Sequence, residues 1–268
     1  MANEKSKGNI PFFGLIVIVV SIIVGWLIYS FVLGNGGNFE GGSHDNKPLN
    51  GNLLATMYKG GFIVPFLIAI LIIVLTFTLE RFITIQAAKG KGSVEAFVRN
   101  VREMVARGDI QGAIAACDLQ RGSVANVIRS GLVKYEQVEN DTELEKEEKI
   151  ASIQKSLEEA TALELPMLSK NLVIISTCAS VSTLVGLLGT VQGMIHAFSA
   201  LAQSGAPDAI GLANGISEAL VNTFLGILAA ALGIIFYNLF NSLIDSLTFG
   251  MDEAGYSIVQ TYSATHKK

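Results

Sequence analysis

Long uncharged apolar runs divide this chain. Four stretches lack Asp, Glu, Lys and Arg: Phe12 to Leu33, Phe62 to Leu79, Asn171 to Ala206, and Ala219 to Ile244. A helix that crosses a bilayer needs about 20 predominantly apolar residues, and each run is long enough to qualify. The pattern predicts an all-α polytopic membrane protein with four transmembrane helices, of which the last two are long and extend into a cytoplasmic helical region.

The runs and the segments between them give a predicted organisation. It comprises an N-terminal tip and first transmembrane anchor (1–33), a Gly- and Asn-rich periplasmic loop (34–60), a second transmembrane helix (61–85), a cytoplasmic helical region (86–165), a third transmembrane helix (166–202), a short periplasmic loop (203–212), a fourth transmembrane helix (213–247) and a cytoplasmic tail (248–268). The first run is also compatible with a cleaved signal sequence. It is longer than the usual apolar core of about 7–15 residues, which favours a retained anchor.

Basic residues predict the orientation. Lys5 and Lys7 precede the first run, a cluster of Lys and Arg follows the second, and Lys267 and Lys268 end the chain. The loop of residues 34–60 has only two lysines. Because cytoplasmic flanks carry the excess of Lys and Arg, we expect both termini and residues 86–165 in the cytoplasm.

Helical periodicity returns in the cytoplasmic region. Apolar residues recur at i, i+3 and i+4 from Ser93 to Ala106, with Ser93 as the expected N-cap, and shorter helices are expected at 110–119 and 126–135. The acidic run 139–149 is typical of a solvated loop or helix face. Pro166 should mark a helix boundary or kink, because proline lacks a backbone donor. Residues 34–60 are expected to form an exposed flexible loop.

The third run has polar and small residues at helical spacing. One predicted face carries Ser180, Thr183 and Thr190 among other residues, and an adjacent stripe consists of Gly186, Gly189 and Gly193. Small residues allow membrane helices to pack closely, and hydroxyl groups can also bond to their own helix. Thr190 therefore fits a packing role and a role in an ion pathway equally well, and Ser180 and Thr183 are further candidates for either role.

The fourth run contains an acid and an amide. At 100° per residue, Asn222 lies about 40° from Glu218 around a helix, and Thr223 lies about 140° from it. The polar side chains of this helix are therefore expected to face two different neighbouring helices. Gly226 continues a small-residue surface. Glu218 is either a functional intramembrane carboxylate or a carboxylate at the membrane interface. His196, near the end of the third run, fits a proton relay or an interfacial residue.

Composition argues against several classes of protein. The net charge of −4 does not indicate nucleic-acid binding, and Cys117 and Cys178 lack the spacing of a metal site or disulfide. The chain shows neither a phosphate-binding loop nor a nucleophile with an evident base. We therefore expect no enzyme activity, no cofactor and no metal.

Two motifs together resemble the MotA/TolQ/ExbB proton-channel family, and most closely its ExbB and TolQ branch. They are GLLGTVQGMI at 186–195 and GISEALVNT at 215–223, in this order after a cytoplasmic helical segment. The resemblance implies a homo-oligomeric ring in the bacterial inner membrane, typically of five subunits, around a single-span ExbD/TolR-like partner that carries an aspartate. Proton flow would then drive a TonB/TolA-like protein for outer-membrane transport or integrity.

By this resemblance Thr190 and Thr223 match the channel-lining threonines, and Glu218 matches the acid of the last span. The Ile-Pro kink common in that span reads Ala231-Leu232 here, and the first span is additional to the simplest three-span plan. Two alternatives stay open: a MotA-like stator subunit that acts on a rotor, and a membrane scaffold that conducts no ions.

Overall fold

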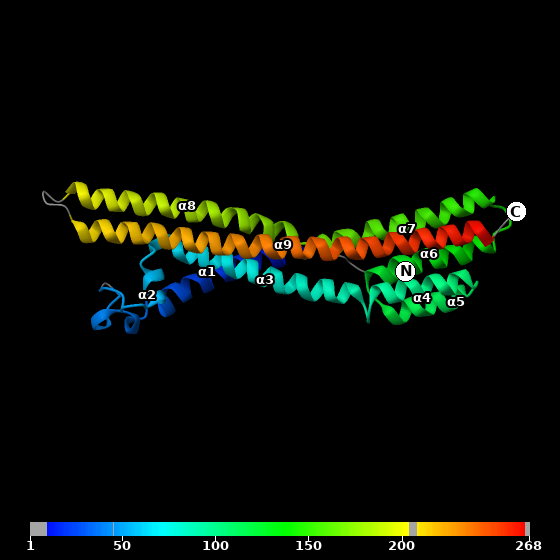
Figure 1. The fold of residues 1–268 in the computed structure, drawn as a ribbon, viewed down its shortest axis with the longest axis horizontal. Coiled ribbons are helices and arrows are strands. Elements are labelled where there is room, and N and C mark those ends of the chain that lie inside the picture. Colours follow the sequence, from blue (N-terminus) through cyan, green and yellow to red (C-terminus); the bar gives the residue numbers. More distant parts are fainter. Residues whose placement is uncertain (1–9, 45, 204–207, 266–268) are drawn as a thin grey trace. The chain divides into compact units, whose positions relative to one another are not determined.

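The structure is a computed structural model that describes residues 10–44, 46–203 and 208–265. Within these ranges the secondary structure is helical, apart from an isolated antiparallel bridge between Phe39 and Pro48 (Figure 1). Four helical stretches are long and apolar enough to cross a membrane: Gly14–Leu33, Gly61–Ala106, Lys146–Ala202 and Ala209–Thr265. The prediction of an all-α protein with four membrane-spanning helices is confirmed.

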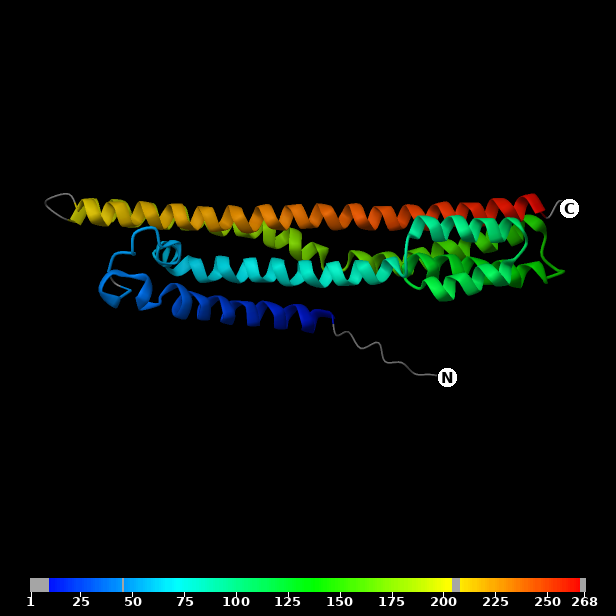
Figure 2. The same cartoon turned by 60° about the horizontal axis from the view of Figure 1, so that its bottom comes forward.

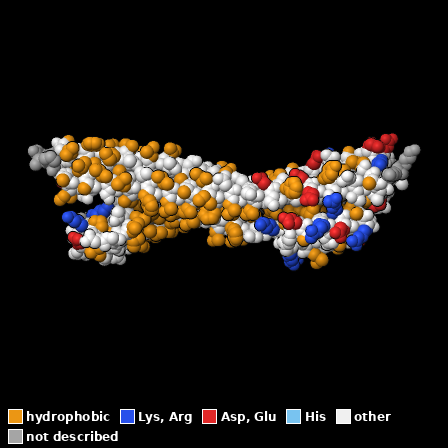
Figure 3. All heavy atoms as spheres, in the orientation of Figure 1, with side chains coloured by type: hydrophobic (Ala, Val, Ile, Leu, Met, Phe, Trp, Pro, Cys, Tyr) orange, Lys and Arg blue, Asp and Glu red, His pale blue; other side chains and the backbone are white. Residues whose placement is uncertain are grey.

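The chain divides into two compact units. The first unit comprises residues 1–79 and 173–237, and the second comprises residues 80–172 and 238–268. Hydrophobic side chains cover the visible surface of α8 and the adjoining part of α9, whereas acidic and basic side chains gather on α4 to α7 (Figure 3). This division follows the apolar and polar segments of the sequence.

The first unit contains the apolar helices and the segment that links the first two of them. Its elements are α1 (Ile10–Leu27), the π-helical η1 (Ile28–Leu33), the 3₁₀ turns η2 (Gly36–Asn38) and η3 (Glu40–Gly42), α2 (Leu53–Tyr58), the 3₁₀ turn η4 (Gly61–Ile63), most of α3 (Val64–Lys89), nearly all of α8 (Leu172–Gln203) and the first half of α9 (Ala209–Thr265).

The first apolar run packs against the second (Figure 2). A Cβ atom added at Gly25 would lie 2.6 Å from the carbonyl oxygen of Pro65, so only glycine allows this approach. At the far end of the run, Leu33 joins Val64 and Val221 in a buried apolar cluster. The first run therefore contacts the first unit along one side, while most of its apolar side chains are exposed on the protomer.

Residues 34–60 have more structure than the sequence predicts. Phe39 is only 2% exposed. Tyr58 stacks on Tyr29 with a centroid separation of 4.6 Å. The side-chain oxygen of Asn52 accepts hydrogen bonds from the amides of Leu54 and Ala55 and so begins α2. The prediction of an exposed loop is wrong at these residues, because aromatic side chains spaced among the glycines form a small core of their own.

The second unit is a bundle of shorter helices. It contains α4 (Val94–Ala106), α5 (Ile110–Gln120), α6 (Ser123–Glu139) and α7 (Lys146–Ser169), together with the C-terminal parts of α3 and α9. The Ser93 hydroxyl accepts a hydrogen bond from the Ala96 amide, which confirms the predicted N-cap. Within the acidic run, Glu145 and Glu148 form a reciprocal capping box at the start of α7.

Close helix contacts define the core of this second unit. Gly131 of α6 has no side chain where Leu157 of α7 packs, and an added Cβ would lie 2.4 Å from a Leu157 methyl carbon. Tyr135 of α6 meets Tyr262 of α9 edge to face, with centroids 4.7 Å apart. Both tyrosines are buried, so the C-terminal end of α9 is held in the bundle.

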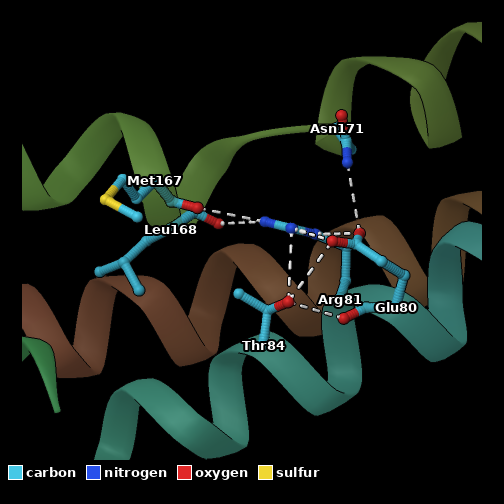
Figure 4. Close-up of polar contacts among 6 residues, drawn as sticks. All are labelled: Glu80, Arg81, Thr84, Met167, Leu168 and Asn171. Carbon is cyan, nitrogen blue, oxygen red and sulfur yellow. Dashed lines mark hydrogen bonds and ion pairs between the residues drawn. The ribbon is translucent and has the colours of Figure 1, made fainter. Parts of the chain in front are cut away.

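A buried clamp lies at the break between α7 and α8 (Figure 4). Pro166 is inside α7, which ends at Ser169, and the break falls at Asn171 with a φ of 65°. The predicted boundary at Pro166 is thus a few residues early. Arg81, only 2% exposed, donates to the carboxylate of Glu80 and to the carbonyl oxygen of Leu168.

Arg81 therefore has a different environment from the one its position suggests. Directly after an apolar run, Glu80 and Arg81 are typical of residues at a membrane interface. In the structure the guanidinium satisfies the carbonyl oxygens of Met167 and Leu168, each at 3.2 Å, which would otherwise lack helical partners. The amide of Asn171 donates to Glu80 at 3.4 Å and completes the clamp.

Candidate functional site

Small residues bring α8 and α9 into close contact along the first unit. A Cβ added at Gly193 would lie 2.6 Å from the backbone nitrogen of Ala219, and one at Gly186 would lie 3.1 Å from the Cα of Gly226. Gly189 faces the side chain of Asn222. The three glycines of α8 thus lie against α9, and Gly226 of α9 lies against α8, which places the polar side chains of the two helices within reach of one another.

Thr190 and Thr223 are hydrogen-bonded through their hydroxyl groups. Each hydroxyl also lies 3.2 Å from a carbonyl oxygen of its own helix, at Gly186 for Thr190 and at Ala219 for Thr223. A hydroxyl has one proton but can accept two hydrogen bonds, so one threonine donates across the seam while the other donates to its own backbone. These two directions are chemically equivalent, and the pair can reverse without a change in the backbone.

The threonine pair is not sealed inside the protomer. Both side chains are partly exposed. Thr190 lines an open hollow of about 560 Å³, whose other lining residues are Val191, Met194, Ile195, Phe198, Ser199 and Ala202. The hydroxyl pair therefore lies where an apolar surface of α8 meets the α8–α9 seam.

Glu218 and Thr223 both have partners on α8, whereas the helical angles predicted that the two would face different neighbours. The carboxylate oxygen Oε2 of Glu218 is 2.8 Å from Nδ1 of His196 on α8. The two side chains differ in exposure: His196 is 54% exposed and Glu218 only 14%. The structure thus pairs two residues that the sequence analysis assigned to separate, independent roles.

Asn222 is fully buried between three elements. Its amide nitrogen donates to the carbonyl oxygen of Gly60 at 2.8 Å, and Gly189 packs against the same side chain. Its carbonyl oxygen Oδ1 is buried and has no hydrogen-bond partner within the described part of the chain. Asn222, one residue before Thr223, therefore ties the segment that precedes α3 to α9.

Ser180 and Thr183 point their hydroxyls at their own helix. Ser180 donates to the carbonyl oxygen of Ser176 at 3.2 Å, and Thr183 lies 3.5 Å from that of Ala179. Both side chains are exposed on the protomer. These contacts are typical of hydroxyls that satisfy the backbone of a membrane helix, and the structure does not bring either residue to the Thr190–Thr223 pair.

A comparison with protein families decides the relationship of this chain. The profile of the MotA/TolQ/ExbB proton channel family matches residues 121–253. The match covers just under half of the chain, and over these residues the chain is similar to this family. The matched range includes α8 and most of α9, so Thr190, Glu218 and Thr223 all fall within the part shared with the proton channel family.

The individual relatives that the chain resembles are named ExbB and TolQ. It is 43% identical over 90 residues to the biopolymer transport protein ExbB-like 3 of Synechocystis, covering 33% of this chain and 43% of the relative. It is 29% identical over 119 residues to the Tol-Pal system protein TolQ of Pseudomonas aeruginosa, covering 44% and 52%. The biopolymer transport protein ExbB of Salmonella typhimurium is 29% identical over 160 residues, covering 58% and 66%.

The matches are partial. The chain aligns with 43% of the length of the first of these relatives and 52% of the second. The family match begins at Arg121, so α1, the segment of residues 34–60 and α3 lie before it. Sequence reasoning missed three contacts: the clamp at Arg81, the Asn222–Gly60 bond and the His196–Glu218 pair. Each joins residues far apart in the chain.

Proposed function

We propose that the chain is the ring-forming subunit of an inner-membrane motor that conducts protons and transmits the proton motive force. The observation that carries the proposal is the hydrogen-bonded pair of Thr190 and Thr223, which lie in the two uncharged runs 171–206 and 219–244. Five copies would surround a single-span ExbD/TolR-like partner, and the complex would act on a TonB/TolA-like protein. Both termini would lie in the cytoplasm.

The chemistry of the pair fits proton passage. A membrane potential supplies about 2.3 kcal/mol per elementary charge per 100 mV. A bare charge in hydrocarbon costs more than this, so a proton needs groups that donate and accept along its route. The two hydroxyls do both, and their hydrogen bonds can reverse direction. They would hold water beside an acid of the partner, whose protonation removes its charge and allows it to move to the next subunit.

Glu218 has a separate part in the proposal. It lies toward the end of α8 and the beginning of α9, which the orientation rule assigns to the periplasmic side. A carboxylate at this position would attract protons to the outer entrance. The relatives named ExbB and TolQ favour this function over that of a MotA-like stator.

The proposal is tested by proton flux in vesicles that contain the chain and its single-span partner. Thr190→Val and Thr223→Val keep the side-chain shape but remove the hydroxyl. We expect each to lower flux at least about tenfold, equivalent to about 1.4 kcal/mol, while the oligomer still assembles. Ser180→Ala and Thr183→Val are matched controls, since those hydroxyls contact only their own helix among the described contacts, and should conduct normally. Normal flux in both test variants would refute the channel.

A further inference from the structure

The His196–Glu218 pair joins a solvent-exposed side chain to a mostly buried one. His196 lies about two turns before the end of α8, and Glu218 lies near the start of α9, so the connection between the helices brings them to the same end. The imidazole Nδ1 and the carboxylate Oε2 are 2.8 Å apart, which is hydrogen-bond distance. The histidine is 54% exposed and the glutamate 14%.

The enclosure of Glu218 is built by the segment before α3. Gly61 has a φ of +77°, and a Cβ added there would lie 2.7 Å from Oε1 of Glu218. The neighbouring residue Gly60 is held by Asn222, one turn further along α9. The carboxylate therefore has glycine backbone on one side and the imidazole on the other. Tyr29 of η1 is also close enough to interact electrostatically with its charge.

This arrangement limits how a proton can reach Glu218. Gly61 covers Oε1, and Oε2 faces His196, whose ring is the more exposed group of the two. Imidazole has an unperturbed pKa near 6.5 and gains and loses protons readily at neutral pH. Neither a glycine backbone nor a tyrosine hydroxyl exchanges protons in this way near pH 7.

We propose that His196 is the proton donor through which protons from the outer side reach Glu218. The imidazolium ring breaks its Nδ1–H bond, an O–H bond forms at Oε2 of Glu218, and the charged pair becomes a neutral imidazole and a carboxylic acid. Glu218 then releases the proton to water on the inner side of the pair. The ring takes a new proton from outer water after a tautomer change or a rotation of its exposed side chain. This inference rests on the proposed proton conduction.

The test uses chemical rescue in spheroplasts that express the chain with its single-span partner, with proton flux followed after a drop in outer pH. His196→Ala should lower flux about fivefold or more. Because the site is open, added imidazole should restore at least about half of the lost flux in a concentration-dependent way. Pyrazole, a ring of the same size that stays unprotonated at neutral pH, should have no effect.

Two further variants separate proton transfer from positioning. His196→Gln can still donate a hydrogen bond to Glu218 but cannot carry a proton, so it should conduct as poorly as His196→Ala. His44→Ala is the control, because it removes a histidine of the segment between α1 and α3 whose ring packs edge to face on Tyr58. It should conduct like the wild type, with or without imidazole.

The outcomes distinguish this inference from the proposed function. If wild-type flux is normal and His196→Gln conducts equally well, His196 only positions Glu218 and the donor role is refuted. A loss in His196→Ala that imidazole does not restore also refutes it. If the wild-type chain assembles with its partner but conducts no protons, the proposed function is overturned, and this inference fails with it.

Discussion

Arg81 donates to the carbonyl oxygen of Leu168 across 87 positions of sequence. The guanidinium thereby closes the end of a helix to which it does not belong, and Glu80 neutralises its charge in place. Carbonyl groups in the last turn of a helix usually bond to water or to a following glycine motif. Here a buried cation takes that role beside an apolar membrane segment.

Arg81→Met should destabilise the protein severely. The change leaves the carbonyl oxygens of Met167 and Leu168 without their donor and leaves Glu80 without its counter-charge. Removal of one partner of a buried pair costs about 3–5 kcal/mol. Unfolding in detergent, followed by circular dichroism, would measure the loss.

A matched control is Arg107→Met. Arg107 also pairs with a glutamate, Glu103, but the two side chains are 76% and 57% exposed. Exposed pairs contribute at most about 1 kcal/mol, so this variant should be close to the wild type. Equal losses in the two variants would show that the clamp at Arg81 adds nothing beyond an ordinary surface pair.

Gly193→Ala should loosen the contact between α8 and α9. The added methyl group would meet the backbone of Ala219 and Gly215, which cannot rotate away as a side chain can. Overpacking of this kind costs about 1–3 kcal/mol. Gly14→Ala is the comparison, because its methyl group meets only a side-chain carbon of Ile174, at 3.8 Å. If Gly14→Ala has a lower melting temperature than Gly193→Ala, the close contact between α8 and α9 at Gly193 is contradicted.

Tyr262→Ala should unfold the C-terminal part of the second unit. Tyr262 is 1% exposed and packs on Tyr135, and loss of a buried aromatic ring costs about 3–5 kcal/mol. Tyr256→Ala, on the same helix but 70% exposed, should cost little. Limited proteolysis at the C terminus is the readout, with faster cleavage expected only for Tyr262→Ala.

Cys117 should resist alkylation in the folded protein. Burial, reinforced by the neighbouring carboxylate of Asp118, raises the pKa of this thiol to about 12. The reactive thiolate is therefore scarce at pH 8, whereas an unfolded cysteine with a pKa near 8.5 ionises appreciably. With Cys178 replaced by alanine, iodoacetamide should label Cys117 only after denaturation, as read by mass spectrometry.

The control for this labelling places a thiol nearby on the surface. Leu119 is 73% exposed, so Leu119→Cys in a chain without Cys117 and Cys178 should react within minutes at pH 8. If native Cys117 is labelled as fast as Leu119→Cys, α5 unfolds readily and the prediction is wrong.

Periodicity predicted the helices but not their long-range polar contacts. Ser93 and the residues after it carry a local cap and an apolar stripe, so α4 could be predicted with its first residue. The contact between Asn222 and the carbonyl oxygen of Gly60 has no such signal, because any residue supplies a carbonyl and 162 positions separate the two. Likewise, the motifs point to Thr190 and Thr223 individually, while only the fold shows that their hydroxyls meet.

His196 and Arg81 show the limits of interpreting polar residues one at a time. A lone histidine near a span end and a Glu-Arg pair after an apolar run both have ordinary interfacial explanations. Their partners lie on other helices, Glu218 for His196 and the end of α7 for Arg81. Helical angles place residues on faces, but the angles do not say which face of which neighbour lies opposite.

The continuity of α9 has a mechanical consequence. This helix runs for 57 residues, from Ala209 to Thr265, without a proline. An unbroken hydrogen-bonded spiral resists twisting about its own axis. A single proline in the middle of the helix, at Ala231 or Leu232, would remove one backbone donor and break this continuous spiral.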